Sequence, residues 1–470
     1  MEYEYKTIIE PFRIKVVEPL PKLTRNERVA ALEKAHFNLF SLPARAVTFD
    51  LLTDSGTSAM SAHQWAGIME GDESYAGSIS FEHFEQTIQD LTGMEFVIPT
   101  HQGRSAEYLL MRSQVKRKQV VVGNTHFDTT RANIENAGAE ALDFPSPANL
   151  DSSSLDPFKG NMDLDKLGRY LEANSANTRG GFAAHAKVAM AIVTITNNSV
   201  GGQPVSLDNI RATRELLNSY GIPLFIDCAR FAENAYLVKS RDPRCKDWSV
   251  KKIAQEFFSC ADGALMSAKK DAFGNIGGFL ATRRGELAQQ IRNLMVITEG
   301  FPTYGGLAGR DLEALSIGLR EVLDESYLAY RIRSVEYFGE GIEKAGFKTV
   351  KPFGGHAVYI DAGLSLPKIP PSQFPGWSLS VALFREIGIR SVEVGSVMLG
   401  KKDAKTGREI PAPKELVRLA VPRRVYTQSH VDYMVEGLAQ LATTLGDLRG
   451  YRFIEEAPVL RHFTSKFAPL

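Results

Sequence analysis

The chain has few cysteines and no long apolar segment. Only three cysteines occur among 470 residues, at Cys228, Cys245 and Cys260, and none has the CxxC spacing of zinc and redox motifs. We therefore expect no disulfide framework, no zinc site and a reducing, cytoplasmic location. No segment is long and apolar enough to cross a bilayer, and charges occupy the N-terminal positions where a signal peptide has its apolar core. Neither secretion nor membrane insertion is expected.

A net charge is also lacking. The sequence has 55 basic and 55 acidic residues, without a polybasic run or a basic tail. Nucleic acids and anionic membranes are therefore not expected as partners, because both recruit proteins through clustered positive charge. The hydrophobic content of 44% and the charged content of 23% are those of an ordinary globular protein.

The length predicts more than one domain. A chain of 470 residues is longer than a single hydrophobic core usually organises. The first 50 residues have too little apolar content for a core of their own, and the C-terminal part mixes helical and strand patterns. We expect an N-terminal arm and small-domain segment at 1–55, a large domain at 56–320 and a small C-terminal α+β domain at 321–470.

Strand and helix patterns alternate through the predicted large domain. Apolar runs predict strands at 95–99, 119–123, 187–196, 223–227, 264–266 and 277–281. Helical spacing predicts helices between several of them, at 105–112, from about 129 to 137 and at 210–220, and one long helix follows at 311–335. This alternation with short connections predicts an α/β fold with a doubly wound, mainly parallel sheet. The ligand of such a sheet lies beyond the carboxyl ends of its strands.

Polar or aromatic side chains stand at the ends of these strands. They are Gln102, Phe127, Asn198, Asp227, Ser267 and Lys270. Several have an ordinary structural alternative, since Phe127 suits a core, Asn198 suits a turn and the neighbouring Asp128 suits a helix cap. Their coincidence on successive strands favours one shared ligand site.

Lys270 is the centre of that site. A lysine pair is usually a solvated surface feature, but here it follows a buried strand and precedes the glycine pair at 277–278, which permits a close backbone approach. Partial burial disfavours the ammonium form and makes a lysine an imine-forming nucleophile. We hypothesise that Lys270 binds pyridoxal phosphate as an imine, and that Asp227 keeps the pyridine nitrogen protonated. The turn before the helix at 105–112 is suited to the phosphate.

Several motifs carry a resemblance to a known family. They are EPFRIK at 10–15, DLLTDSGT at 50–57, THQGR at 100–104, GGQPVS at 201–206, SAKKD at 267–271, YGGLAGR at 304–310, PRRVYT at 422–427 and LRHFT at 460–464. On these motifs the chain resembles the β-eliminating lyases of fold type I, which comprise tryptophan indole-lyases and tyrosine phenol-lyases. The resemblance covers nearly the whole chain. It implies an aspartate-aminotransferase-like large domain with a seven-stranded sheet, and a homotetramer with active sites at subunit interfaces.

The resemblance also implies roles for the cofactor residues. Lys270 matches the Schiff-base lysine and the base that removes the Cα proton, and Asp227 matches the partner of the pyridine nitrogen. Phe127 matches the ring that stacks on the cofactor. The contacts to the 3′-oxygen match Asn198 and Arg230, and the phosphate site matches Gln102, Gly103, Arg104, Ser267 and Lys269.

Substrate and metal residues follow from the same resemblance. Arg418 matches the clamp for the substrate carboxylate; from its strand pattern alone it is either that clamp or a buried ion-pair partner. Thr53 and Ser55 lie in a polar loop that matches the rest of the carboxylate site, although the pattern alone also suits a turn. Tyr75 matches a catalytic tyrosine donated from a neighbouring subunit. An activating potassium site at a subunit contact matches Gly56, Glu73 and Asn275.

Three positions separate the two subfamilies. This chain has Asp128, Val394 and His462, where the phenol-lyases have threonine, arginine and phenylalanine. The combination implies β-elimination of L-tryptophan to indole, pyruvate and ammonia, with Tyr75, Asp128 or His462 assisting protonation of the indole ring. Alternatives are a tyrosine phenol-lyase or a lyase for another β-substituted amino acid, an aminotransferase, and a non-catalytic protein of the same fold.

Overall fold

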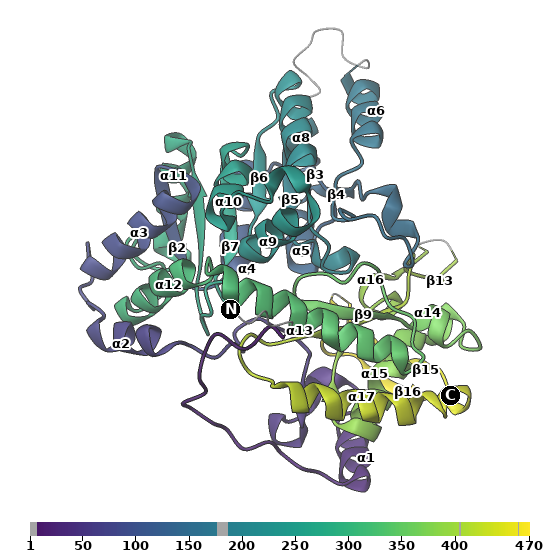
Figure 1. Ribbon diagram of the computed structural model, residues 1–470. Coiled ribbons are helices and arrows are strands. Elements are labelled where there is room, and N and C mark those ends of the chain that lie inside the picture. Colours follow the sequence, from purple (N-terminus) through teal and green to yellow (C-terminus); the bar gives the residue numbers. More distant parts are fainter. Residues whose placement is uncertain (1–6, 176–186, 404–405, 459) are drawn as a thin grey trace. The chain divides into compact units, whose positions relative to one another are not determined.

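The chain forms two units, each with its own sheet and core (Figure 1). The computed structural model describes residues 7–175, 187–403, 406–458 and 460–470. The large unit consists of Ser55–Asn149 and Asp156–Ala329. The small unit consists of Met1–Asp54, Leu150–Leu155 and Tyr330–Leu470.

A seven-stranded sheet organises the large unit. Its strands lie in the order β2-β8-β7-β6-β5-β3-β4, and only β8 runs antiparallel to its neighbours. The bounds are β2 Phe96–Thr100, β3 Val120–Gly123, β4 Glu140–Asp143, β5 Val188–Thr194, β6 Leu224–Asp227, β7 Gly263–Ser267 and β8 Gly278–Thr282. The predicted mainly parallel sheet of an α/β fold is therefore confirmed, and the carboxyl ends of six strands meet at one edge.

Both faces of this sheet are buried, as continuous apolar strands predict. In β3, Val121 packs with α4, α5 and α11, whereas Val120 and Val122 belong to the core on the other face. The helices of the first face are α4 Gly103–Gln114, α5 Asp128–Asn136 and α11 Gly285–Thr298. Those of the second core are α3 Ile79–Thr92, α6 Leu164–Ser175, α8 Leu207–Ser219, α9 Phe231–Arg241, α10 Val250–Ser259 and α12 Gly309–Glu321. The short α2, Ala62–Glu70, packs on α12.

The single long helix predicted at 311–335 is wrong. The structure has two helices there, α12 and α13, and α13 spans Glu325–Lys344. Between them, the Asp324 carboxylate accepts hydrogen bonds from the Tyr327 N–H at 2.8 Å and the Ser326 hydroxyl at 2.5 Å. An aspartate with such bonds caps a new helix, and the apolar spacing continues across the break and hides it.

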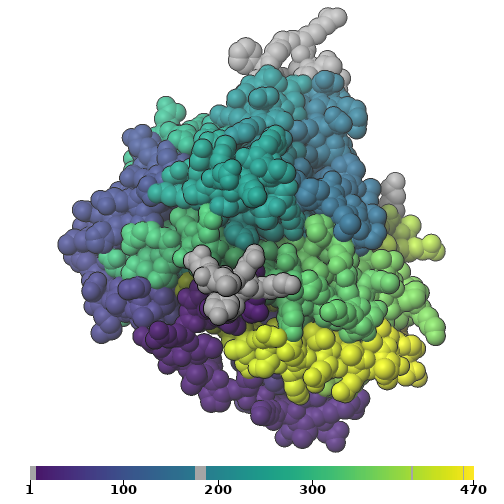
Figure 2. All heavy atoms as spheres, in the orientation of Figure 1, coloured from purple at the N-terminus to yellow at the C-terminus, as the bar shows by residue number. Residues whose placement is uncertain are grey.

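The small unit has an α+β architecture. Its main sheet is antiparallel in the order β11-β14-β9, with bounds Val392–Val394, Leu416–Ala420 and Ala357–Asp361. Smaller pairs are β1 Phe49–Asp50 with β10 Ile389–Arg390, β12 Lys401–Lys402 with β13 Glu409–Ile410, and β15 Tyr451–Glu455 with β16 Lys466–Pro469. Its helices include α1 Arg25–Lys34, α14 Ala362–Ser365, α15 Pro375–Ile387, α16 Ser396–Leu399 and α17 Gln428–Ala442. Figure 2 shows N-terminal (purple) and C-terminal (yellow) segments of this unit side by side on the surface.

Three general features of the structure bear on the composition. No helix among the described residues combines the length and the hydropathy that a membrane span requires. All three cysteines are free thiols. Within the same described ranges, no group of three or more His, Cys, Asp or Glu side chains is placed to hold a metal ion.

Candidate active site

A cavity opens at the carboxyl edge of the large unit's sheet. Because five of the parallel strands end there, the loops that follow them all contribute side chains. The lining residues are Ser55, Gln102, Gly103, Arg104, Glu107, Phe127, Thr129, Thr194, Ile195, Asn198, Asp227, Ala229, Arg230, Leu265, Ser267, Lys269 and Lys270. The cavity thus brings together every residue proposed to hold the cofactor, and Ser55 from the proposed substrate loop.

One end of the cavity is suited to an anion. Gln102 has extended backbone and α4 begins at Gly103, so the first N–H groups of this helix precede its first internal hydrogen bond. A Cβ on Gly103 would lie 2.6 Å from Ser267 Cβ, and a Cβ on Gly278 would lie 2.9 Å from Gly103 N. Glycine at these two positions therefore allows the backbones of β7, β8 and α4 to meet. Arg104 and Lys269 add positive charge on the same side.

Lys270 is held by the residue that follows it. The Asp271 N–H donates to the Ala229 carbonyl at 3.3 Å, and the Asp271 carboxylate accepts a 2.8 Å bond from the Ala232 N–H at the start of α9. Asp271 is fully buried. These bonds fix the turn after β7, which contains Lys270, against the loop that follows β6. Asp227 lies at the end of β6, directly before that loop.

Asp227 is the last residue of β6, and its carboxyl interacts electrostatically with the amine of Lys270. Burial raises the pKa of the Asp227 carboxyl, and the charge of Lys270, a hydrogen bond from the Ala229 N–H and the charge of Arg230 act in the opposite direction. Burial, and then the charge of Arg104, lowers the pKa of Lys269. The cavity therefore combines an amine, a carboxyl and an anion site, all partly removed from water.

These residues fit pyridoxal phosphate. The group needs an amine for its aldehyde, an acid partner for its pyridine nitrogen and donors for its phosphate. Lys270, Asp227 and the N-terminus of α4 supply these three in one cavity. Phe127 provides a flat apolar ring, and the cavity-lining Asn198 and Arg230 provide donors for the ring oxygen.

Sequence reasoning missed several lining residues, of which Glu107 is the most unusual. It lies one turn into α4, is 5% exposed, and accepts a 2.7 Å hydrogen bond from the Thr130 hydroxyl. A glutamate at this place in a helix has no sequence pattern that distinguishes it from a surface residue. Its position against α5 becomes visible only in the structure.

The small unit contains three of the residues predicted for substrate binding, Thr53, Val394 and Arg418, whereas Ser55 lines the cavity of the large unit. Arg418 on β14 is directly opposite Val392 on β11 and Tyr359 on β9, so these side chains and Val394 share one face of the sheet. The Arg418 Nη2 donates to the Leu52 carbonyl at 3.0 Å, next to Thr53. An arginine that is only 7% exposed among apolar neighbours is placed for a charged ligand or partner.

His462 belongs to the same part of the small unit. Its buried ring lies 5.6 Å from the ring of Phe40 and 4.0 Å from that of Phe463. Phe40 packs against the cluster that contains Val394 and Tyr359. An aromatic shell of this kind around position 394 suits a flat apolar substrate ring.

Tyr75 and Asp128 lie outside the cavity of their own chain. Tyr75 is exposed and packs its ring 5.3 Å from Tyr304 and 5.4 Å from Phe301. Asp128 is the first residue of α5 and its carboxylate accepts a 2.6 Å bond from the next N–H, that of Thr129. Because Phe127 is the N-cap of this helix and no side chain caps it, Asp128 does not act as the helix cap considered from the sequence.

The three residues proposed for potassium divide into two places. The Asn275 side-chain amide donates to the Gly56 carbonyl at 3.0 Å. The Glu73 carboxylate instead accepts bonds from the Gly309 N–H at 2.8 Å and the Arg310 N–H at 3.2 Å, at the start of α12. Despite its partial burial, these bonds and the Arg310 charge lower the pKa of Glu73 overall.

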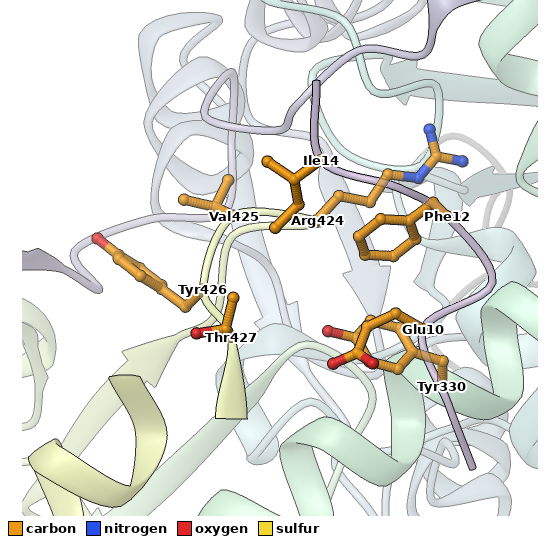
Figure 3. A pocket seen from close by; sticks show the side chains of 8 residues that line it. All are labelled: Glu10, Phe12, Ile14, Tyr330, Arg424, Val425, Tyr426 and Thr427. Carbon is orange, nitrogen blue, oxygen red and sulfur yellow. The ribbon is translucent and has the colours of Figure 1, made fainter. Parts of the chain in front are cut away.

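A second cavity lies within the small unit (Figure 3). It is lined by Glu10, Phe12, Ile14, Tyr330, Arg424, Val425, Tyr426 and Thr427. Phe12 of the N-terminal segment meets Tyr330 edge-to-face at 5.4 Å. No lysine and no aspartate line it, so the chemistry of an imine-bound cofactor points to the cavity of the large unit.

Comparison with known proteins decides the family. A family model described as "Beta-eliminating lyase" matches residues 50–437. The chain belongs to the β-eliminating lyase family. The lyase is 54% identical to a tryptophanase of Salinibacter ruber over 463 residues, which cover 98% of this chain and 96% of that protein. It is 45% identical to a tyrosine phenol-lyase of Intrasporangium calvum over 463 residues, with 98% and 96% coverage.

Solved structures support the fold of this lyase. A serine palmitoyltransferase of Sphingomonas wittichii has a TM-score of 0.56 at 11% identity and covers 85% of this chain and 88% of its own. A structure of SPT with a PLP internal aldimine has a TM-score of 0.54 at 12% identity, with 84% and 88% coverage. At these identities the likeness concerns the fold alone, and it confirms the predicted fold type I architecture.

Proposed function

We propose that this lyase binds pyridoxal phosphate in the large-unit cavity and converts L-tryptophan and water to indole, pyruvate and ammonia. The observation that carries the proposal is the meeting of Lys270, Asp227 and the N-terminus of α4 in one cavity. The higher identity to the tryptophanase than to the tyrosine phenol-lyase supports tryptophan as the substrate. So do Asp128, Val394 and His462, which distinguish the tryptophan subfamily by resemblance.

The bound cofactor supplies an electron sink that stabilises negative charge at the substrate Cα. Lys270 anchors the group and then, as a free amine, takes the Cα proton. Asp227 holds a proton at the pyridine nitrogen. The N-terminus of α4, with Ser267 and Lys269, holds the phosphate, while Asn198 and Arg230 hold the ring oxygen. Phe127 fixes the ring plane.

The substrate groups are assigned to further residues. Arg418 holds the α-carboxylate through paired N–H donors, with Thr53 and Ser55 as additional donors. Val394 provides an apolar wall for the indole ring. One of Tyr75, Asp128 and His462 delivers the proton to indole C3, after which indole leaves and water completes the release of pyruvate and ammonia.

Assembly and ion requirements form part of the proposal. We propose a homotetramer in which the exposed Tyr75 serves the site of a neighbouring subunit. Potassium is proposed to activate the enzyme by binding at a subunit contact that joins Gly56 and Asn275 with Glu73, which lies apart from them within one chain. The cytoplasm is the proposed location, because thiols such as the three free cysteines stay reduced there.

The test is a product assay on the purified protein with pyridoxal phosphate and potassium. Indole, phenol, pyruvate and ammonia are measured with L-tryptophan and with L-tyrosine. Stoichiometric indole, pyruvate and ammonia from tryptophan are expected, and Lys270→Ala should abolish both turnover and the imine absorbance. Transfer of the amino group to the cofactor without ammonia would indicate an aminotransferase. Turnover of tryptophan by the Lys270→Ala variant would refute the assignment of the lysine.

A further inference from the structure

Glu107 joins two helices at the wall of the cofactor cavity. Its Oε1 accepts a 2.7 Å hydrogen bond from the Thr130 hydroxyl, and its Oε2 accepts a 3.3 Å bond from the Asn133 amide. Both donors lie on α5, whereas Glu107 lies on α4, three residues after Arg104. The carboxyl is therefore held in place by two partners while it lines the cavity.

Glu107 shares this cavity with a second buried carboxyl, that of Asp227. Burial, followed by the charges of Asp227 and Asp128, raises the pKa of Glu107 to about 7, while the hydroxyls of Thr130 and Thr129 act in the opposite direction. Because the charge of one carboxyl acts on the other inside this buried cavity, the two do not ionise independently.

The other surroundings of α4, the helix of Glu107, are apolar on one side and charged on the other. Where α4 meets α11 the contact is apolar, with Leu109 and Leu110 against Leu287 and Ile291. The cavity lining includes the positively charged Arg104, Arg230, Lys269 and Lys270. On α5, Arg131 pairs with Asp143. The ionisation of Glu107 therefore changes the charge balance inside the cavity.

We propose that the ionisation of Glu107 sets the charge of the cofactor cavity and thereby its affinity for the anionic cofactor. This inference rests on the proposed function, because it assumes that pyridoxal phosphate occupies the cavity. When Glu107 is neutral, Asp227 is the one carboxylate opposite the pyridine nitrogen. When Glu107 is ionised, it adds a second negative charge to a cavity that must also accept a phosphate, and this charge weakens binding of the anionic cofactor.

The test compares cofactor binding by the apoprotein and by its Glu107→Gln variant across pH. Glutamine keeps the shape of the side chain and accepts the bond from Thr130, but it does not ionise. The dissociation constant for pyridoxal phosphate is measured by absorbance from about pH 6 to about pH 8.5. The ratio of the wild-type constant to the variant constant should rise on the order of tenfold as pH passes about 7, equivalent to one pKa unit of coupling.

Glu85 offers a matched control. It lies on α3, away from the cavity lining, and burial raises the pKa of its carboxyl too. Glu85→Gln should keep the wild-type pH dependence of cofactor binding. A Glu85→Gln variant that loses this dependence as Glu107→Gln does would overturn the assignment to Glu107.

Two further variants keep the test decisive if Glu107→Gln does not fold. Glu107→Asp retains an ionisable group and should keep the pH dependence, whereas Glu107→Ala should lose it. The same dependence in both variants, or a constant ratio between wild type and Glu107→Gln, overturns the role of Glu107. A wild-type protein that binds no pyridoxal phosphate at any pH refutes the proposed function instead, so the two failures are distinguishable.

Discussion

Replacing Gly103 by alanine should damage the cofactor site through one added methyl group. The new Cβ would lie 2.6 Å from Ser267 Cβ, 2.9 Å from Ser267 Cα and 3.0 Å from Ser267 N, where ordinary contacts begin at 3.4 Å. Two of these atoms are backbone atoms at the end of β7, so no side-chain rotation relieves the overlap. Either α4 or the strand end must move.

The size of the effect follows from two opposing contributions. Overpacking a tight site costs about 1–3 kcal/mol. Alanine also restricts the unfolded chain more than glycine does, which returns about 0.4–1 kcal/mol where the backbone conformation suits it. We expect a net loss of about 1–2 kcal/mol in the free energy of unfolding. Because the displaced groups are the proposed phosphate donors, affinity for pyridoxal phosphate should fall about tenfold or more, equivalent to about 1.4 kcal/mol.

Urea unfolding of the apoprotein and titration with pyridoxal phosphate measure the two effects. Gly168 in α6 is the control, because a Cβ there meets nothing within 4 Å. Gly168→Ala should leave cofactor affinity unchanged and stabilise the protein by about 0.5–1 kcal/mol through helix propensity. A Gly103→Ala variant with wild-type stability and wild-type affinity would refute the close approach of α4 and β7.

Two further predictions concern the small unit. Burial, and then the charge of Glu415, raises the pKa of Glu393 to about 8, so the folded protein binds more protons than the unfolded chain between about pH 4.5 and about pH 8. Stability from this group is therefore present below that window and lost as pH rises through it. Because each pKa unit corresponds to about 1.4 kcal/mol, Glu393→Gln should remove roughly 5 kcal/mol of this pH dependence in urea unfolding. An unchanged slope would contradict the prediction. Combining Val394→Arg with Asp128→Thr should raise phenol release from tyrosine relative to indole release from tryptophan by about tenfold, because arginine pairs with a phenol oxygen. Asp128→Thr alone is its control, and an unchanged product ratio in a folded double variant would argue against a role of position 394 in specificity.

The strand ends of the large unit were predictable because each signal is local. An apolar run followed by a polar residue identifies a buried strand and its carboxyl end, and the parallel arrangement brings these ends to one edge. Asp227 and Lys270 follow from this rule, and the structure places both in the cavity. The start of α4 was harder, since a lone glycine is a weak signal. Its close contact with Ser267 depends on how β7 packs against the helix.

Features that depend on partners distant in the chain could not be predicted. The Leu52 carbonyl that accepts from Arg418 is 366 positions away, and the burial of Glu107 depends on α5. Glu73 shows the same limit, because nothing in its own loop announces the bonds from Gly309 and Arg310. The missed break between α12 and α13 has a different cause, since the Asp324 cap is a local signal that the continuing apolar spacing outweighed.

Register in the small unit places the residue proposed to bind the substrate carboxylate, Arg418, beside the position proposed to select the substrate, Val394. Arg418 pairs with Val392, and the two-residue period of a strand then brings Val394 to the same face. A shift of β11 by one residue would turn Val394 to the opposite face and remove it from Arg418. The residues proposed to hold the cofactor, among them Lys270 and Asp227, stand on a different sheet, in the large unit. This separation gives a physical reason why a change in the proposed substrate wall does not require a change of the large unit's sheet.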